Sequence, residues 1–296
     1  MRLYLDCIPC YLRQALEAIR MVSENKALHE KVMRESIKAA GKFDTDNIGL
    51  MTQYEIQKII KKYTHDGDPY KKVKERFNSI CLDLAGDLQE RIRKSKDPFQ
   101  TGLRIALAGN IIDFGPKAKL DRKIILENIE QSLVQELDRN FMEALRREIA
   151  GAKKILYIGD NAGEIVLDRL FIEVLPREKI TYAVRGGPAL NDITMDDAVM
   201  TGMDKEVKVI TTGLDMPAAI LPLCSREFIE EYRSSDLVIA KGQGNYEALS
   251  DEDKNIFFLL KIKCPVIANS IGNGYKVGDI VVYMPHSTDY GKFSDQ

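Results

Sequence analysis

The chain divides near residue 150 into two halves that differ in their pattern of apolar and polar residues. In the first half, apolar residues recur at steps of three and four, as they do along the buried face of an α-helix. Clear examples lie at residues 8–19, 73–92, 103–110 and 137–149. No run in this half is typical of a strand, so residues 1–150 are predicted to form a helical module.

The second half begins after Ala150-Gly151 and contains short runs of β-branched and other apolar residues. These runs predict strands at residues 155–158, 180–184, 207–210, 237–240, 265–268 and 280–283. Continuous apolar runs separated by helix-length segments are typical of a parallel sheet that is buried on both faces. The carboxyl ends of parallel strands meet along one rim of the sheet, which is where open α/β folds bind their ligands.

The composition is that of a folded globular protein, with 45% hydrophobic and 30% charged residues. The 43 basic and 45 acidic residues give a net charge of −2, whereas a dedicated nucleic-acid-binding domain is distinctly basic. No apolar run approaches the length of a membrane span, and the first residues lack the apolar region of a signal peptide. Five cysteines, an odd number, do not predict a disulfide framework. We therefore expect a soluble cytoplasmic protein without a nucleic-acid or membrane partner.

The first predicted strand leads into the strongest candidate site, within the segment KKILYIGDNAGEIVLD at residues 153–168. Asp160 and Asn161 follow the strand, and a helical pattern starts at Glu164. Backbone N–H groups at the amino end of a helix favour an anion, and carboxylate and amide oxygens suit Mg²⁺ or Mn²⁺. The spacing Asn161-x-x-Glu164 is also that of an ordinary capping box, which needs no metal.

The second predicted strand is followed by RGGPALNDITMDD, which would bring Asp192 to the same rim. Thr194 and Asp197 have the spacing of a capping box, so we interpret Asp197 as part of a helix cap. Asp192 precedes that cap and could be a second carboxylate ligand. Two carboxylates and one amide leave half of an octahedron for water and a substrate phosphate.

The fourth predicted strand ends at Lys241, followed by Gly242, Gly244 and Asn245. A lysine at the end of a buried strand is costly unless an anionic group meets it. The glycines would let backbone N–H groups approach a phosphate closely. The alternative is a flexible turn with a solvated lysine.

Two further features in the helical half have a functional and a structural interpretation. Cys7 and Cys10 could hold zinc, but a zinc site needs a second pair of ligands; the alternative is a helix start with Asp6 as N-cap. Asn110 and Asp113 close a helix and could reach the rim, or serve only as a cap.

Six segments of the chain, taken in order, resemble the metal-dependent damage-control phosphatases, a family long known as domain of unknown function eighty-nine. They are CIPC, AGNIIDFG, GDNAGEIVLD, RGGPALNDITMDDA, KGQGNYE and LLKIKCPVIA. With its N-terminal CxxC motif, the sequence resembles the compact archaeal-and-bacterial-type branch of the family. The resemblance implies an α/β fold in which a helical module, residues 1–150, packs on a Rossmann-like, mostly parallel three-layer domain, residues 151–296.

The resemblance also implies the chemistry of the site. One divalent ion (Mn, Mg, Co or Ni) would be held by Asp160, Asn161 and Asp192. The expected catalytic residues are Asp160, Asp192 and Lys241. The residues expected to contact substrate or phosphate are Glu164, Gly242, Gly244, Asn245 and Lys263.

The expected activity is hydrolysis of small phosphorylated metabolites, with damaged ones as one candidate class. The sugar-phosphate branch of the family carries an acid and an arginine where this chain has Gln243 and Glu247, which leaves the substrate open. Two alternatives remain. One is an S-adenosylmethionine-dependent protein carboxyl methyltransferase, and the other is a non-catalytic sensor of phosphorylated metabolites.

Overall fold

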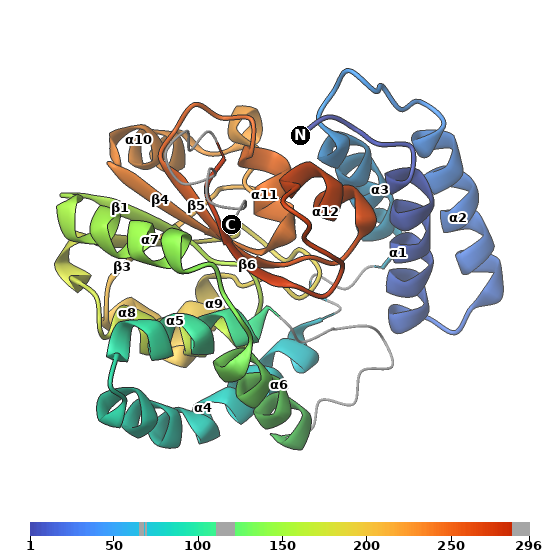
Figure 1. Ribbon diagram of the computed structural model, residues 1–296. Coiled ribbons are helices and arrows are strands. Elements are labelled where there is room, and N and C mark those ends of the chain that lie inside the picture. Colours follow the sequence, from blue (N-terminus) through green and yellow to red (C-terminus); the bar gives the residue numbers. More distant parts are fainter. Residues whose placement is uncertain (65–67, 69, 111–121, 286–296) are drawn as a thin grey trace.

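A computed structural model describes residues 1–64, 68, 70–110 and 122–285 of the chain (Figure 1). Its centre is a six-stranded sheet in the order β3-β2-β1-β4-β5-β6, which is the strand order of the Rossmann fold. The strands are β1 (Ile155–Ile158), β2 (Ile180–Val184), β3 (Lys208–Thr211), β4 (Leu237–Lys241), β5 (Ile256–Lys261) and β6 (Ile280–Tyr283).

The first five strands are parallel, and β6 pairs antiparallel with β5. The predicted α/β class with a mostly parallel sheet is therefore confirmed. Strand β1 lies between β2 and β4, so the order of the strands reverses between β1 and β4. In folds of this kind, ligands bind outside the carboxyl ends of the strands at this switch point.

One predicted strand is wrong. Residues 265–268 form the start of helix α12 (Pro265–Ile271), with Pro265 in its first turn, where the fixed φ of proline suits a helix and its missing N–H is not needed. The fifth strand is instead Ile256–Lys261, whose sequence IFFLLK is a continuous buried run. The apolar residues after Pro265 predict a strand because periodicity alone cannot distinguish a short buried helix from a strand.

Twelve α-helices lie in the described part of the chain. Those before the sheet are α1 (Cys7–Val22), α2 (Lys26–Ala40), α3 (Gly49–Thr64), α4 (Lys71–Lys94), α5 (Pro98–Gly109), α6 (Arg122–Val134) and α7 (Arg139–Gly151). Those within the α/β half are α8 (Glu164–Ile172), α9 (Met195–Thr201), α10 (Arg226–Ser234), α11 (Gly242–Leu249) and α12. None of the helices described is long and apolar enough to cross a membrane.

The sheet is covered by helices on both faces because successive residues of a strand point to opposite sides. Ile155 and Tyr157 of β1 face a core shared with α4, α5, α7 and α8. Leu156 and Ile158 face a second core, shared with α10, α11 and α12. The sheet is thus the middle layer of three, and its strands have no polar face.

The first three helices form a core of their own, and α3 also packs on the sheet, because its Leu50 is buried in the core shared with α10, α11 and α12. They stand together at one side of the molecule, drawn in blue in Figure 1. The boundary predicted at residue 150 marks the start of the sheet, and α4, α5 and α7 on its amino side share a core with the sheet.

Apolar and charged contacts join the α1–α3 bundle and the amino terminus to the α/β half. Leu50 of α3 is buried in the core shared with α10, α11 and α12, and Met51 and Tyr54 pack against that core. Lys61 of α3 pairs with Asp215, in the loop after β3. The amino group of Met1 donates to the carbonyl of Glu247 at 2.8 Å and pairs with Asp251 at 3.1 Å. The bundle is therefore anchored beside α11, at the carboxyl ends of the strands.

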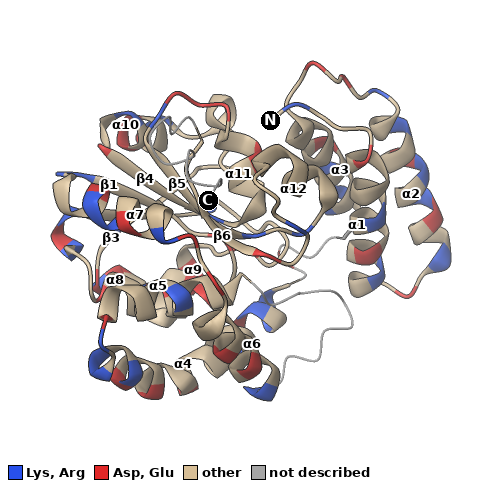
Figure 2. Ribbon diagram, viewed as in Figure 1, with Lys and Arg blue, Asp and Glu red and all other residues tan. Residues whose placement is uncertain are grey.

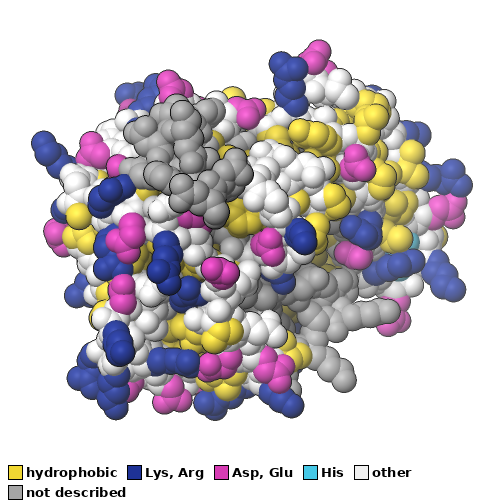
Figure 3. Space-filling model, viewed as in Figure 1, with side chains coloured by type: hydrophobic (Ala, Val, Ile, Leu, Met, Phe, Trp, Pro, Cys, Tyr) yellow, Lys and Arg dark blue, Asp and Glu magenta, His cyan; other side chains and the backbone are white. Residues whose placement is uncertain are grey.

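Charged residues of both signs are interspersed along the helices (Figure 2). In the space-filling view, basic and acidic side chains alternate over the visible face without a large patch of one sign (Figure 3). This distribution matches the net charge of −2.

The shared core of α4 and the sheet generates a stability prediction. Phe77 is fully buried in α4, and a Cβ added to Gly163, after β1, would lie 2.2 Å from its ring. Phe77→Ala should lower the free energy of unfolding by about 3–5 kcal/mol, because the cavity would open between α4 and the β1 loop. Urea denaturation measures this, and Ile37→Ala on the exposed face of α2 is the control, expected within about 0.5 kcal/mol of wild type. Equal stabilities for the two variants would contradict the shared core.

Candidate functional site

The three residues predicted to bind a metal lie together at the carboxyl end of β1. Asn161 forms an isolated antiparallel bridge with Asp192, and the N–H of Ile193 donates to the carbonyl of Asp160 at 3.0 Å. These backbone bonds pin the loop after β2 against the loop after β1. Asp160, Asn161 and Asp192 are 7%, 6% and 3% exposed. These three side chains therefore lie side by side in a nearly closed site.

A fully buried arginine holds the two carboxylates. Nε of Arg185 donates to Oδ2 of Asp192 at 2.6 Å, and Nη2 donates to Oδ1 of Asp160 at 3.3 Å. Nη1 donates to Oδ1 of Asn245 at 3.3 Å. Arg185 was not among the predicted site residues, although it has the same sequence signal as Lys241: a cation directly after a buried strand, where it needs an anionic partner.

The other carboxylate oxygen of Asp160 contacts Asn110 of the helical half and lies beside Gly242 at the start of α11. Oδ2 accepts from Nδ2 of Asn110 at 3.0 Å and from Nδ2 of Asn161 at 2.6 Å. Gly242 has a φ of +80°, and a Cβ there would lie 1.9 Å from Oδ2. Only glycine lets the backbone come this close to the carboxylate. Both interpretations of Asn110 describe it, since it is the C-cap of α5 and its side chain reaches the rim; Asp113 lies outside the described residues.

Burial dominates the electrostatics of the two rim carboxyl groups. Removal from water raises the pKa of Asp192 to about 7, against the lowering effect of Arg185. Burial also raises the pKa of Asp160, and the negative charge of Glu164 adds to this, whereas Arg185 and Lys263 oppose it. Lys263 is exposed, and its charge acts on both rim carboxylates.

Lys241 is fully buried, and its ammonium has three protein partners. Nζ lies 2.6 Å from Oε1 of Glu164 and 2.6 Å from Oδ1 of Asp168, and it donates to the carbonyl of Ala106 at 2.9 Å. Burial lowers the pKa of Lys241, but Asp168 and Glu164 more than offset this and raise it. The anionic partner that the sequence demands for Lys241 is supplied by these carboxylates, and its catalytic role stays a prediction.

The charges in and behind the rim do not balance. Among the described residues, four carboxyl groups, of Asp160, Glu164, Asp168 and Asp192, are buried there, and their buried ion-pair partners are Arg185 and Lys241. With all four ionised, two negative charges are left over. Unbalanced buried charge is strongly unfavourable, which is why burial raises the pKa of Asp160, Asp168 and Asp192. A cation bound beside these carboxyl groups would offset the same charge.

The capping alternative for Asn161 does not describe the start of α8. The N-cap is Gly163, with a φ of +73° and no side-chain cap bond. Glu164 does accept from the N–H of Asn161, at 3.4 Å, but the Asn161 side chain does not cap the helix in return. At α9, by contrast, the capping box predicted for Thr194 and Asp197 is confirmed.

The glycine-rich segment after β4 is the first turn of α11 and not a flexible turn. Gly244 packs against the carbonyl of Pro217, where a Cβ would lie 2.3 Å away. Asn245 is fully buried, and its Nδ2 donates to the carbonyl of Lys241 at 2.7 Å. Gly242, Gly244 and Asn245 therefore bring the amino end of a helix to the rim beside Asp160.

Lys263 lies in the loop between β5 and α12, and its backbone is tied to α11. Its N–H donates to Oε1 of Gln243 at 3.0 Å, and Nε2 of Gln243 donates to Glu247 at 2.9 Å. Gln243 and Glu247, the two positions at which the chain departs from the sugar-phosphate branch, thus cross-link α11 to the lysine loop.

The cysteine pair lies at the start of α1, as its structural interpretation predicts. Cys7 and Cys10 are free, half-buried thiols. Across residues 1–64, 68, 70–110 and 122–285, no three His, Cys, Asp or Glu side chains are grouped so that they could hold a metal ion. The zinc interpretation therefore finds no second ligand pair there. The Asp160–Asn161–Asp192 group is of a different kind, because one of its three members is an amide.

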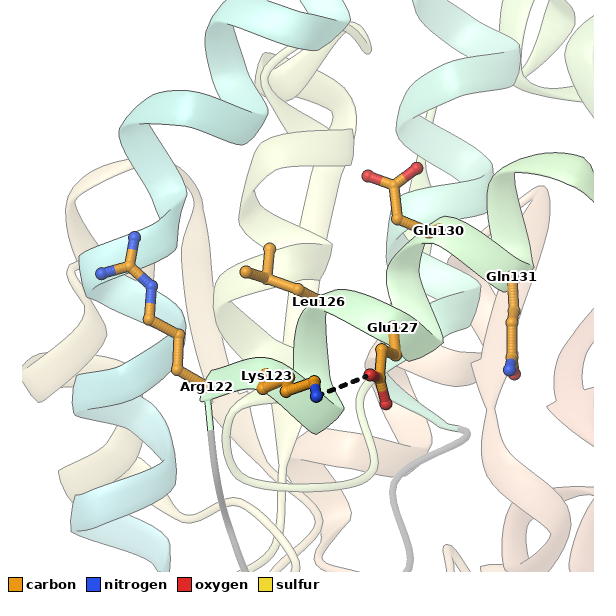
Figure 4. Close-up of a pocket in the computed structure, with 6 residues that line it drawn as sticks. All are labelled: Arg122, Lys123, Leu126, Glu127, Glu130 and Gln131. Atoms are coloured by element: carbon orange, nitrogen blue, oxygen red, sulfur yellow. Dashed lines mark ion pairs between the residues drawn. The ribbon is translucent and has the colours of Figure 1, made fainter.

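A cavity of about 650 Å³ lies over α6 and is separate from this rim (Figure 4). Its lining residues are Arg122, Lys123, Leu126, Glu127, Glu130 and Gln131. None of the predicted site residues lines it, and all six come from one surface helix.

The sequence and the structure of this chain are similar to those of known proteins over nearly the whole chain. The model of the damage-control phosphatase ARMT1-like domain matches residues 3–277. An uncharacterized protein of Methanocaldococcus jannaschii is 33% identical over 94% of this chain and 93% of its own length. A damage-control phosphatase of Pyrococcus horikoshii is 32% identical over 92% and 94%, and one of Archaeoglobus fulgidus is 32% identical over 93% and 96%. The crystal structure of a DUF89 family protein from Pyrococcus horikoshii superposes with a TM-score of 0.85 at 30% identity, covering 95% of this chain and 98% of that one.

The close approach of Gly242 to Asp160 can be tested against a second glycine. Gly242→Ala should destabilise the protein, because the new Cβ would collide with the carboxylate and φ is positive. Gly86 lies within α4 with no atom near its Cβ position, so Gly86→Ala should stabilise the protein by about 0.5–1 kcal/mol. Urea denaturation of both variants gives the comparison. A Gly242→Ala variant as stable as the Gly86→Ala variant would show that the backbone does not crowd Asp160.

Proposed function

Because this chain belongs to the family of damage-control phosphatase ARMT1-like domains, we propose that it is a divalent-metal-dependent phosphatase acting on small phosphorylated metabolites. The names of its archaeal relatives support phosphatase activity, with damaged metabolites as the substrate class. The dependence on a metal and the preference for phosphomonoesters are our own proposal, argued from the site.

The observation that carries the proposal is the excess of carboxyl groups over buried basic groups among the described residues in and behind the rim. A divalent cation beside Asp160 and Asp192 would balance it. Hard carboxylate and amide oxygens are the ligands that Mg²⁺ and Mn²⁺ favour, so the residues present fit such an ion. We propose that Asp160, Asn161 and Asp192 hold it, with Mn, Mg, Co or Ni as candidates.

When bound, the ion would supply polarisation of the phosphoryl group and help to activate the attacking water. Residues of the chain beside the proposed ion shape the space for the phosphate. The amino end of α11 lies beside Asp160, and the free N–H groups of a helix start favour a phosphate. Gly242 keeps a side chain out of the space beside Asp160.

Of the two lysines predicted to stabilise the transferred phosphoryl group, Lys263 suits the role better. It is exposed at the rim and its charge acts on Asp160 and Asp192. A positive charge at this place would offset the negative charge that develops in the transition state. Lys241 is fully buried and its three N–H donors have protein partners, so we assign it a supporting role behind the site.

The proposal is tested by the hydrolysis of an aryl phosphate with Mn²⁺, Mg²⁺, Co²⁺ or Ni²⁺, and with a chelator. We expect turnover with at least one ion and none with the chelator. Asp192→Asn keeps the shape of the side chain but removes a charged ligand. Since changes one layer behind a metal cost about 10–100-fold, this variant should lose more than about 100-fold in turnover.

Asp196→Asn is the matched control, because Asp196 is exposed on α9 four residues further along the chain. It should retain wild-type turnover. Hydrolysis that persists in chelator, or an Asp192→Asn variant as active as the control, would contradict metal dependence at this site. Tight binding of S-adenosylmethionine without metal would favour the methyltransferase alternative.

A further inference from the structure

A second layer of buried polar groups lies directly behind the three proposed metal ligands. We call it the Glu164 network, and it consists of Tyr157, Glu164, Asp168, Tyr182 and Lys241. All five side chains are fully buried. The network connects the sheet, through β1, β2 and β4, with helix α8, and its contact with the rim runs through Glu164.

Glu164 sets the direction in which the Asn161 amide points. Nδ2 of Asn161 donates to Oε2 of Glu164 at 3.0 Å and to Oδ2 of Asp160 at 2.6 Å. Both acceptors are carboxylates, which accept but cannot donate when ionised. The amide nitrogen is therefore held between them, and the amide oxygen faces the other way, where it accepts from Asn191. That oxygen is the atom of Asn161 that could reach a metal ion.

Glu164 is itself fixed on several sides. Its Oε1 pairs with Lys241 at 2.6 Å, and its Oε2 also accepts from Nδ2 of Asn110 at 3.3 Å. A Cβ added to Gly109 of α5 would lie 2.7 Å from Cγ of Glu164, so the helix backbone presses on the side chain. No part of the carboxylate is exposed, and each oxygen is met by protein donors.

Lys241 is fixed in turn by Asp168. Oδ1 of Asp168 pairs with Lys241 at 2.6 Å and accepts from the hydroxyl of Tyr157 at 2.8 Å. Oδ2 accepts from the hydroxyl of Tyr182 at 2.9 Å. The rings of Tyr157 and Tyr182 stack with centroids 5.3 Å apart. Every charged group of the network therefore has partners on rigid strands or helices.

We propose that Glu164 is a positioning residue for the metal site: it orients the amide of Asn161 so that its oxygen faces the ion, and Lys241 with Asp168 holds Glu164 in place. The inference rests on the proposed metal-dependent function. It replaces the substrate contact that the family resemblance implies for Glu164, because a fully buried carboxylate enclosed by protein donors cannot reach a substrate outside.

Glu164→Gln separates the two roles. Glutamine has a single acceptor oxygen, and the charged Lys241 should take it because charge-assisted hydrogen bonds are the stronger ones. The NH₂ group would then face the NH₂ group of Asn161, so the Asn161 amide should rotate and turn its oxygen away from the ion. The affinity for Mn²⁺ should fall by about 10–100-fold, as is usual when a partner of a metal ligand is changed.

The measurement is a calorimetric titration of Mn²⁺ into the wild-type protein and its variants, with thermal unfolding recorded in parallel. Glu231→Gln is the matched control. Glu231 is also buried and ion-paired, with Lys154 and Lys208, but it lies at the amino ends of the strands beside Thr181. It should lose stability without a change of more than about twofold in Mn²⁺ affinity, since it touches no ligand of the ion.

Two further results distinguish positioning from a general structural effect. In the charge-conserving double variant Asn161→Asp/Glu164→Gln, the new carboxylate can accept from the glutamine and still offer an oxygen to the ion, so Mn²⁺ affinity should recover. At saturating Mn²⁺, the KM of Glu164→Gln should equal that of wild type. If Glu164→Gln does not fold, Glu164→Asp, which keeps the charge but withdraws it from Asn161, must show the same loss of affinity.

Unchanged Mn²⁺ affinity in the folded Glu164 variants would overturn the positioning role while leaving the proposed function intact. A raised KM with unchanged affinity would do the same and restore the substrate contact. A wild-type protein that binds no Mn²⁺, Mg²⁺, Co²⁺ or Ni²⁺ would overturn the proposed function and this inference together.

Discussion

Charge burial at the switch point of the sheet is the constraint on which the site depends. Charged groups can stay out of water only when each meets opposite charge and hydrogen-bond partners. Two cations satisfy this condition at different depths. Arg185 joins the carboxylates at the surface of the rim, and Lys241 joins those behind it. The outer group is the place where we propose that a divalent cation binds, whereas the inner group is closed by α5, α8 and the sheet.

The same constraint explains why glycines surround the site. Backbone must approach the buried carboxylates closely for its N–H groups and helix ends to act on them, and a side chain would prevent this. Gly242 adjoins Asp160, and Gly109 adjoins Glu164. Gly163 lets the β1 loop turn against Phe77 with a positive φ. The helices of the first half thus form part of the wall of the site, and α4 and α5 cannot be separated from the α/β domain.

The rim itself could be predicted from the sequence because parallel strands end on one side of a sheet. That rule alone brings Asp160, Asn161 and Asp192 together. The cost of burying a cation at the end of a strand also predicts that Lys241 needs an anionic partner. It does not predict which one, since Glu164 and Asp168 come from a helix whose rotation is set by packing. Arg185 was missed although the same rule applies to it. The strand predicted at residues 265–268 is wrong because apolar content outweighs the helix-starting proline. The packing of α4 and α5 on the sheet depends on tertiary contacts that have no local pattern.

The stacked tyrosines behind the site have a consequence for observing it in solution. The chain contains no tryptophan and 12 tyrosines, so its near-ultraviolet circular dichroism arises mainly from tyrosines held in fixed surroundings, a signal that is lost when specific packing loosens. Tyr157 and Tyr182 are fully buried and both donate to Asp168. The protein therefore carries an intrinsic chromophore at the centre of its charge network, and rearrangements there can be followed optically without a label.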